Sequence, residues 1–113
     1  MTFDIAGIAA RLAAAMTASL RSDSGKVKAL AIAEGQSLAH ALARIAGMVA
    51  QGQIDTEEAP VLIRIQRDAS EAVLASLAEV SRVAAHRALG LGMKDIIGQI
   101  EHIVGRPLIG ELL

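Results

Sequence analysis

Apolar residues recur at helical spacing along most of the chain, and clusters of Gly, Ser and Asp divide this pattern into segments. The first segment covers residues 3–20, where one apolar stripe consists of Ile5, Ile8, Leu12, Met16 and Leu20. The second covers residues 25–51, where the stripe consists of Val27, Leu38, Leu42, Ile45 and Val49. Asp23 or Ser24 is placed to cap the second segment, and Gly52 to end it. Two helices are therefore predicted.

A third helix is predicted to begin after a short polar link. Asp55 and Glu58 have the spacing of a capping box, and Pro60 is tolerated only in a first helical turn. Because no Gly or Pro follows until Gly90, we predict one continuous helix over 56–89, roughly 50 Å long. Its main apolar stripe is Leu62, Ile65, Ala69, Val73, Val80 and Val83 or Ala84, with a second edge of Ile63, Leu74 and Leu77.

A fourth helix is predicted over 93–104, where Ile residues form a dense apolar face. Gly90 and Gly92 are interpreted as the terminator and hinge between it and the third helix. The fold class is therefore all-α: an antiparallel helical hairpin (25–51 and 56–89) with flanking N- and C-terminal helices, forming a helical bundle. The length of 113 residues predicts that 1–113 is a single helical-bundle domain.

The composition narrows the classes of function. Hydrophobic residues make up 53% of the chain, but Phe3 is its one aromatic residue, so the core must be built from aliphatic side chains, Met and Ala. The net charge is −1, which argues against a nucleic-acid-binding surface. The absence of Cys excludes thiolate chemistry. The N-terminal segment lacks the basic region of a signal peptide, and no apolar run is long enough for a membrane span, so we expect a cytoplasmic protein.

A row of small residues runs along the second predicted helix, at every fourth position: Ala31, Gly35, Ala39, Ala43 and Gly47. Such a row lets a neighbouring helix come unusually close, which would explain glycines that each cost about 1 kcal/mol in a helix interior. Together with Ile96, Ile100 and Ile103 of the last helix, this row is predicted to be a helix-packing interface. A neutral, Ala-rich helix face is the alternative interpretation.

The four predicted helices carry more apolar surface than they could bury against one another within one chain. A homo-oligomer is therefore predicted, most simply a two-fold dimer, and a protein partner is a further possibility. A compact four-helix monomer with an Ala-rich surface is the alternative. Neither a cofactor nor a nucleic-acid partner is expected.

Two groups of polar residues are candidates for a catalytic or metal-binding site. Glu34, Ser37 and His40 lie close together on the second helix, but a catalytic triad needs its acid on the imidazole and also needs an oxyanion hole, so no catalytic residue is predicted. His86 shares a helix face with Glu79. The Glu-x-x-His spacing of carboxylate-bridged metal sites does not occur in the sequence, so no metal ligand is assigned.

Further polar residues of the third helix fall into two groups, one on its outer face and one near its apolar stripe. Arg67 and Glu71 are predicted to form an exposed pair on its outer face. Gln66, Ser76 and Arg87 fall near the apolar stripe, where they either reach the surface or form a buried polar layer that fixes the register of the helices.

These patterns favour a non-enzymatic helical interaction or assembly protein that acts as a homo-oligomer. Two alternatives remain open. One is an amphipathic helical protein that binds a membrane surface or lipids. The other is a metal-binding bundle that uses His40 or His86 with carboxylates across a subunit interface. Helix-turn-helix binding of DNA is disfavoured, because the helices are too long and the charge is too balanced.

Overall fold

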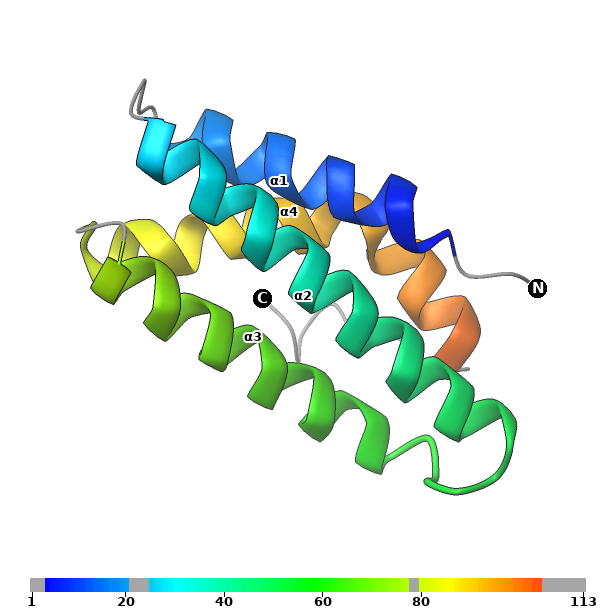
Figure 1. Cartoon of the computed structure of the whole chain (residues 1–113). Coiled ribbons are helices and arrows are strands. Elements are labelled where there is room, and N and C mark those ends of the chain that lie inside the picture. The colour runs from blue at the N-terminus through cyan, green and yellow to red at the C-terminus, as the bar shows by residue number, and fades with distance from the viewer. Residues whose placement is uncertain (1–3, 21–24, 78–79, 105–113) are drawn as a thin grey trace.

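In a computed structural model, the described part of the chain forms four helices. The structure describes residues 4–20, 25–77 and 80–104, with side chains in the last helix through residue 94 and at residues 98 and 101. The helices are α1 (Ile5–Leu20), α2 (Gly25–Ala50), α3 (Glu58–Leu77) and α4 (Arg82–Val104). Successive helices run in opposite directions (Figure 1). The predicted all-α, bundle-like class is confirmed.

The helices pack around one core. α1 and α3 each contact α2 and α4, but do not contact one another within the described residues. The largest fully buried side chains come from all four helices: Ile8, Leu12, Met16, Leu38, Ile63, Leu74, Leu89 and Met93. As the composition requires, this core is aliphatic. Among the described helices, none combines the length and apolar composition needed to cross a bilayer.

Local hydrogen bonds explain several helix ends. The Asp4 carboxylate accepts a hydrogen bond from the Gly7 amide at 3.0 Å, which caps α1. Gly52 has a φ of 73°, and the hydrogen bonds that follow α2, from Gly52 N–H to Val49 O and from Gln53 N–H to Met48 O, form a Schellman motif. The predicted end of the second helix at Gly52 is therefore confirmed, whereas Asp23 and Ser24 lie outside the described residues.

The predicted capping box before α3 is also confirmed. The Asp55 carboxylate accepts hydrogen bonds from the amides of Glu57 and Glu58, at 2.9 and 2.7 Å. In return, the Asp55 amide donates to the Glu58 carboxylate at 3.2 Å.

The prediction of one continuous helix over 56–89 is wrong. α3 ends at Leu77, and α4 begins at Arg82. Val80 and Ser81 are not helical, and the Ser81 hydroxyl accepts a hydrogen bond from the Ala84 amide at 3.0 Å. Ser81 is therefore the N-cap of α4. Neither Val80 nor Ser81 is a Gly or Pro, the usual helix-breaking residues. The Ser81 cap and the packing of α4 therefore account for the new helix that begins at Arg82.

The predicted hinge at Gly90 and Gly92 is also wrong, because both glycines lie inside α4. A Cβ added at Gly92 would lie 3.1 Å from Cδ2 of Leu12. Gly92 is therefore explained by the close packing of α4 on α1, and the fourth helix begins eleven residues earlier than the predicted start at residue 93.

The predicted core-facing stripe of α3 is also rotated in the structure. Ile65 was assigned to the main stripe but is 54% exposed, whereas Ile63 and Leu74 of the second edge are fully buried. Arg67 and Glu71 were expected on the outer face, yet each is only 8% exposed. Because the inward face of α3 carries these charged residues, its apolar pattern alone pointed to the wrong side.

Candidate functional site

The close crossing of α1 and α2 sets the geometry of the candidate site. A Cβ added at Gly35 would lie 2.8 Å from the carbonyl oxygen of Ala9 and 3.2 Å from the amide nitrogen of Ala13. Contacts this short with backbone atoms mean that only glycine fits without moving a helix. The neighbour that comes this close to Gly35 is α1 of the same chain.

The other members of the small-residue row are placed differently along α2. Ala31 and Ala39 are fully buried, whereas Ala43 and Gly47 are half-buried. A Cβ added at Gly47 would have no atom within 4 Å, so the close crossing does not extend that far. The remaining predicted interface residues, Ile96, Ile100 and Ile103, have side chains outside the described part of α4.

An open groove of about 620 Å³ lies between α1 and α2. We call it the α1–α2 groove. Alanine supplies half of its lining, which consists of Ile5, Ala6, Ala9, Ala10 and Ala13 from α1, with Ile32, Gln36 and His40 from α2. Ala9 and Ala13 are the same residues that approach Gly35, so the close crossing also supplies part of the groove lining. Because alanine side chains are short, the groove can receive larger apolar groups.

The rim of the groove on α2 carries positive charge at both ends. Five exposed residues stand four positions apart along this face of the helix: Lys28, Ile32, Gln36, His40 and Arg44. Residues at this spacing form one ridge of a helix surface. The apolar Ile32 is 52% exposed. A ligand that extended one helical turn past each end of the groove lining on α2 would therefore meet a cation at each end.

The solvent-facing side of α1 adds almost no charge. Its exposed residues include Ala6, Ala10, Ala14 and Ala18, again four positions apart. Arg11 is the one charged residue within Ile5–Leu20. The groove is therefore bordered on the α1 side by a smooth, small-residue surface.

A second exposed apolar feature lies on α3, and we call it the α3 ridge. It consists of Val61 and Ile65, which are 53% and 54% exposed and four residues apart. Exposed acidic residues flank them, with Glu57 and Glu58 before Val61 and Asp68 after Ile65, while the exposed Arg64 stands between the two apolar residues. The structure thus places an apolar segment with acidic ends on a different helix from the groove.

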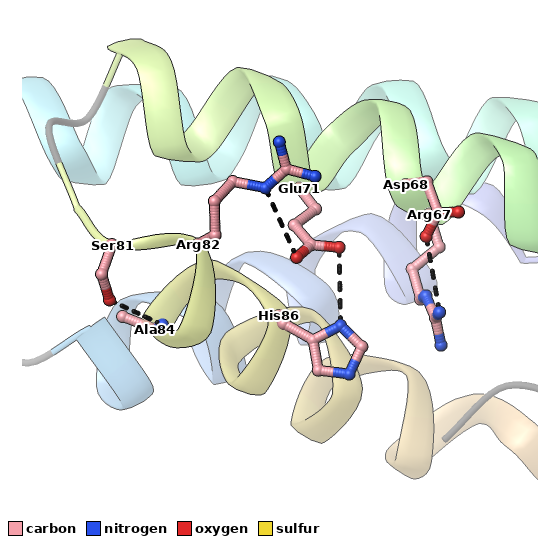
Figure 2. Close-up of polar contacts among 7 residues, drawn as sticks. All are labelled: Arg67, Asp68, Glu71, Ser81, Arg82, Ala84 and His86. Atoms are coloured by element: carbon pink, nitrogen blue, oxygen red, sulfur yellow. Dashed lines mark hydrogen bonds and ion pairs between the residues drawn. The ribbon is translucent and has the colours of Figure 1, made fainter.

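A polar cluster joins α3 to α4 (Figure 2). The buried Glu71 carboxylate lies 3.4 Å from Nδ1 of His86 and 3.7 Å from Nε of Arg82. Arg67, one turn earlier on α3, lies 3.4 Å from Asp68. Ser70 is also buried on this face. The buried polar layer thus consists of Arg67, Ser70 and Glu71, whereas Ser76 and Arg87, two of the residues considered for such a layer, are exposed.

The residues weighed for chemistry are separated. His40 lines the α1–α2 groove, whereas His86 contacts Glu71 at the α3–α4 boundary. Within the described residues, no hydrogen bond joins His40 to Ser37 or Glu34. The same part of the chain contains no group of three or more His, Asp or Glu side chains placed to hold a metal ion.

Fold and site together define a four-helix protein with an apolar groove on one helix pair and an apolar ridge on another helix. No protein-family model, no curated protein and no solved structure matches the chain.

Sequence reasoning missed both the groove and the ridge. The groove residues Ala6 and Ala10 are part of the exposed alanine row of α1, and this spacing is visible in the sequence. The pair of apolar residues four positions apart, Val61 and Ile65, is visible there as well. The sequence alone does not show which helix faces remain exposed after the four helices have packed.

Proposed function

We propose that this protein is a non-enzymatic assembly module that associates with itself through exposed apolar helix faces. The observation that carries the proposal is the apolar α1–α2 groove, which sits beside exposed alanines and a half-exposed Ile32. Solvated helix faces normally carry charged residues, and an open apolar hollow of this kind is a usual feature of a binding surface.

The distribution of large apolar side chains supports the same proposal. Among the large apolar side chains that the structure describes, six are between 46% and 67% exposed: Ile32, Val61, Ile65, Leu77, Val83 and Leu91. Single exposed apolar residues are ordinary on protein surfaces. Here, however, Ile32 lies in a groove, and Val61 and Ile65 are neighbours on one helix face. Burial of such surface contributes roughly 25 cal/mol per Å² to association.

The groove suits a protein segment better than a small molecule. Small-molecule sites usually enclose most of their ligand and contain several converging polar groups. This groove is open, and its polar lining consists of Gln36 and His40. A two-fold dimer is the simplest assembly that would cover such a surface, and it is the state that we propose.

The mass of the protein in solution tests the proposal. Light scattering coupled to size-exclusion chromatography, and sedimentation at rising concentration, should give a mass near twice the monomer mass of 11.7 kDa. The melting temperature should also rise with concentration, because association stabilises the folded state by mass action. A mass of 11.7 kDa from the micromolar to the high micromolar range would contradict self-association.

A matched pair of substitutions links the assembly to the groove. Ile32→Gln removes an apolar side chain at the groove and should weaken association, whereas Leu91→Gln makes the same change on α4, away from the residues that line it. Both side chains are about half exposed, so neither change should alter folding greatly. Equal effects of the two substitutions on the mass would remove the groove from the proposal.

A further inference from the structure

We infer that the occupant of the α1–α2 groove is the α3 ridge of a second copy of this chain. The inference rests on the proposed self-association and names the two surfaces that meet. One molecule carries both an apolar groove and an exposed apolar ridge, and three features argue that they fit one another: shape, charge and placement.

The shapes are complementary at the level of side chains. The groove presents the short side chains of Ala6, Ala9 and Ala10, whereas the ridge presents the branched side chains of Val61 and Ile65. Val61 and Ile65 are four residues apart, so they point the same way from adjacent turns of α3. Larger side chains at this spacing can insert between the small residues of a facing helix pair.

The charges are complementary at both ends of the apolar contact. Lys28 and Arg44 bracket the α2 rim and lie about 24 Å apart along the helix. Glu58 and Asp68 bracket the ridge and lie about 15 Å apart, and Asp68, which also contacts Arg67, keeps an exposed side chain. The long, flexible Lys and Arg side chains can span the difference. Opposite charges at both ends of a contact steer association and fix its register.

A hollow beside the ridge offers a place for one of these cations. It has a volume of about 290 Å³ and is lined by Asp55, Glu57, Glu58, Val61 and Leu62. The guanidinium of Arg44 or the ammonium of Lys28 from the second copy would meet three acidic groups there. Because the hollow adjoins Val61, the charged and apolar contacts would form together.

The groove and the ridge lie on parts of the bundle that do not block one another. α3 does not contact α1 within the described residues, so the ridge is not folded over its own groove. Each copy can therefore offer both surfaces. A two-fold pair in which each ridge fills the other copy's groove makes the same contact twice.

Cysteine cross-linking tests which surfaces meet, and the natural chain contains no Cys to interfere. Ala10→Cys labels the groove and Val61→Cys labels the ridge, at exposed positions. One variant carries a size tag, the two are mixed, and a short bis-maleimide is added. The mixed Ala10–Val61 product should exceed either homodimeric product several-fold. Ala50→Cys, at the exposed end of α2, is the control and should cross-link no faster than random collision.

The alternative contacts give different products. Dominant Ala10–Ala10 cross-links would show that two grooves meet, and dominant Val61–Val61 cross-links would show that two ridges meet. Either result overturns this inference while leaving self-association intact. If the wild-type protein is a monomer, the proposed function fails as well, so the two failures are distinguishable.

Charge substitutions provide a second, independent readout. Ala10→Glu places an acid in the groove, and Ile65→Lys places a cation on the ridge. Each should raise the dissociation constant of the homodimer at least about tenfold. Mixing the two variants pairs an unaltered groove with an unaltered ridge, so association should be stronger in the mixture than in either variant alone. Circular dichroism melts check that both variants fold, and a mixture that associates no better than its components would overturn the inference.

Discussion

The close crossing of α1 on α2 predicts that alanine has opposite effects at two glycines of the same helix. Gly35→Ala and Gly47→Ala both place a methyl group in the interior of α2. In the absence of contacts, each substitution should stabilise the helix by about 1 kcal/mol, because glycine loses more backbone entropy on folding. The difference between the two positions therefore measures the tertiary contact alone.

The magnitude at Gly35 follows from the distances. The added Cβ would lie 2.8 Å from the Ala9 carbonyl oxygen and 3.2 Å from the Ala13 amide nitrogen, which is too close for a carbon atom. These are backbone atoms, so the contact is relieved only when α1 moves away from α2. Overpacking of this kind costs about 1–3 kcal/mol, which exceeds the gain in helix propensity. We expect Gly35→Ala to lower the free energy of unfolding by about 1 kcal/mol.

Gly47→Ala is the matched control, because nothing lies within 4 Å of its added Cβ. We expect it to raise the free energy of unfolding by about 0.5–1 kcal/mol. Thermal and urea unfolding, followed by circular dichroism at equal protein concentration, should place the melting temperatures of the two variants on opposite sides of the wild type. A Gly35→Ala protein as stable as the Gly47→Ala protein would refute the close-crossing argument.

Three further substitutions test the helix ends and the polar cluster. Ser81→Ala removes the cap of α4 and should cost about 1 kcal/mol in urea unfolding, and no loss would show that the cap contributes nothing to the break after α3. Glu71→Ala should lower the free energy of unfolding by about 1–3 kcal/mol, because Glu71 is buried. Arg82→Ala should lower it by less than about 1 kcal/mol, because Arg82 is exposed. A larger loss for Arg82→Ala than for Glu71→Ala would count against this account. Gly92→Ala should change stability less than Gly35→Ala in the same assay, because the one short contact of its added Cβ is with the end of a Leu12 side chain, while the Leu12 backbone atoms lie at 3.6 Å.

The helix ends that could be predicted from sequence are those fixed by local chemistry. Gly52 adopts a positive φ after α2, and Asp55 and Glu58 exchange capping hydrogen bonds before α3. Each signal involves residues within a few positions of one another, so the sequence contains the whole interaction. The predicted bounds of the first two helices also agree with those of α1 and α2 within two residues.

The break between α3 and α4 could not be predicted in this way. The segment before Ser81 consists of residues that are compatible with a helix, and the serine cap resembles many serines inside helices. The chain reverses because α4 must return along α1 and α3 to bury Ala85, Leu89 and Met93. These contacts join residues that are far apart in the sequence. The spacing of apolar residues within one segment carries no information about them.

The candidate site was only partly visible in the sequence. The small-residue row of α2 was recognised, but the sequence did not identify α1 as the helix that approaches Gly35. It also treated Arg67 and Glu71 as exposed, although they occupy the buried face of α3. Once charged residues take the inward face, apolar residues such as Ile65 remain on the outward face. The position of the ridge thus follows from the buried polar layer.

The same composition accounts for the groove. Without Trp or Tyr, and with alanine along much of α1, the helices can approach until backbone meets backbone, as they do at Gly35. Close approach buries Ala9 and Ala13 but leaves Ala6 and Ala10 with side chains too short to fill the space beside Ile32. A larger side chain that filled this space would have to come from outside the α1–α2 pair. α3 carries two such side chains, Val61 and Ile65, on its exposed face. One chain therefore has both the open α1–α2 groove and side chains large enough to fill the groove of a second copy.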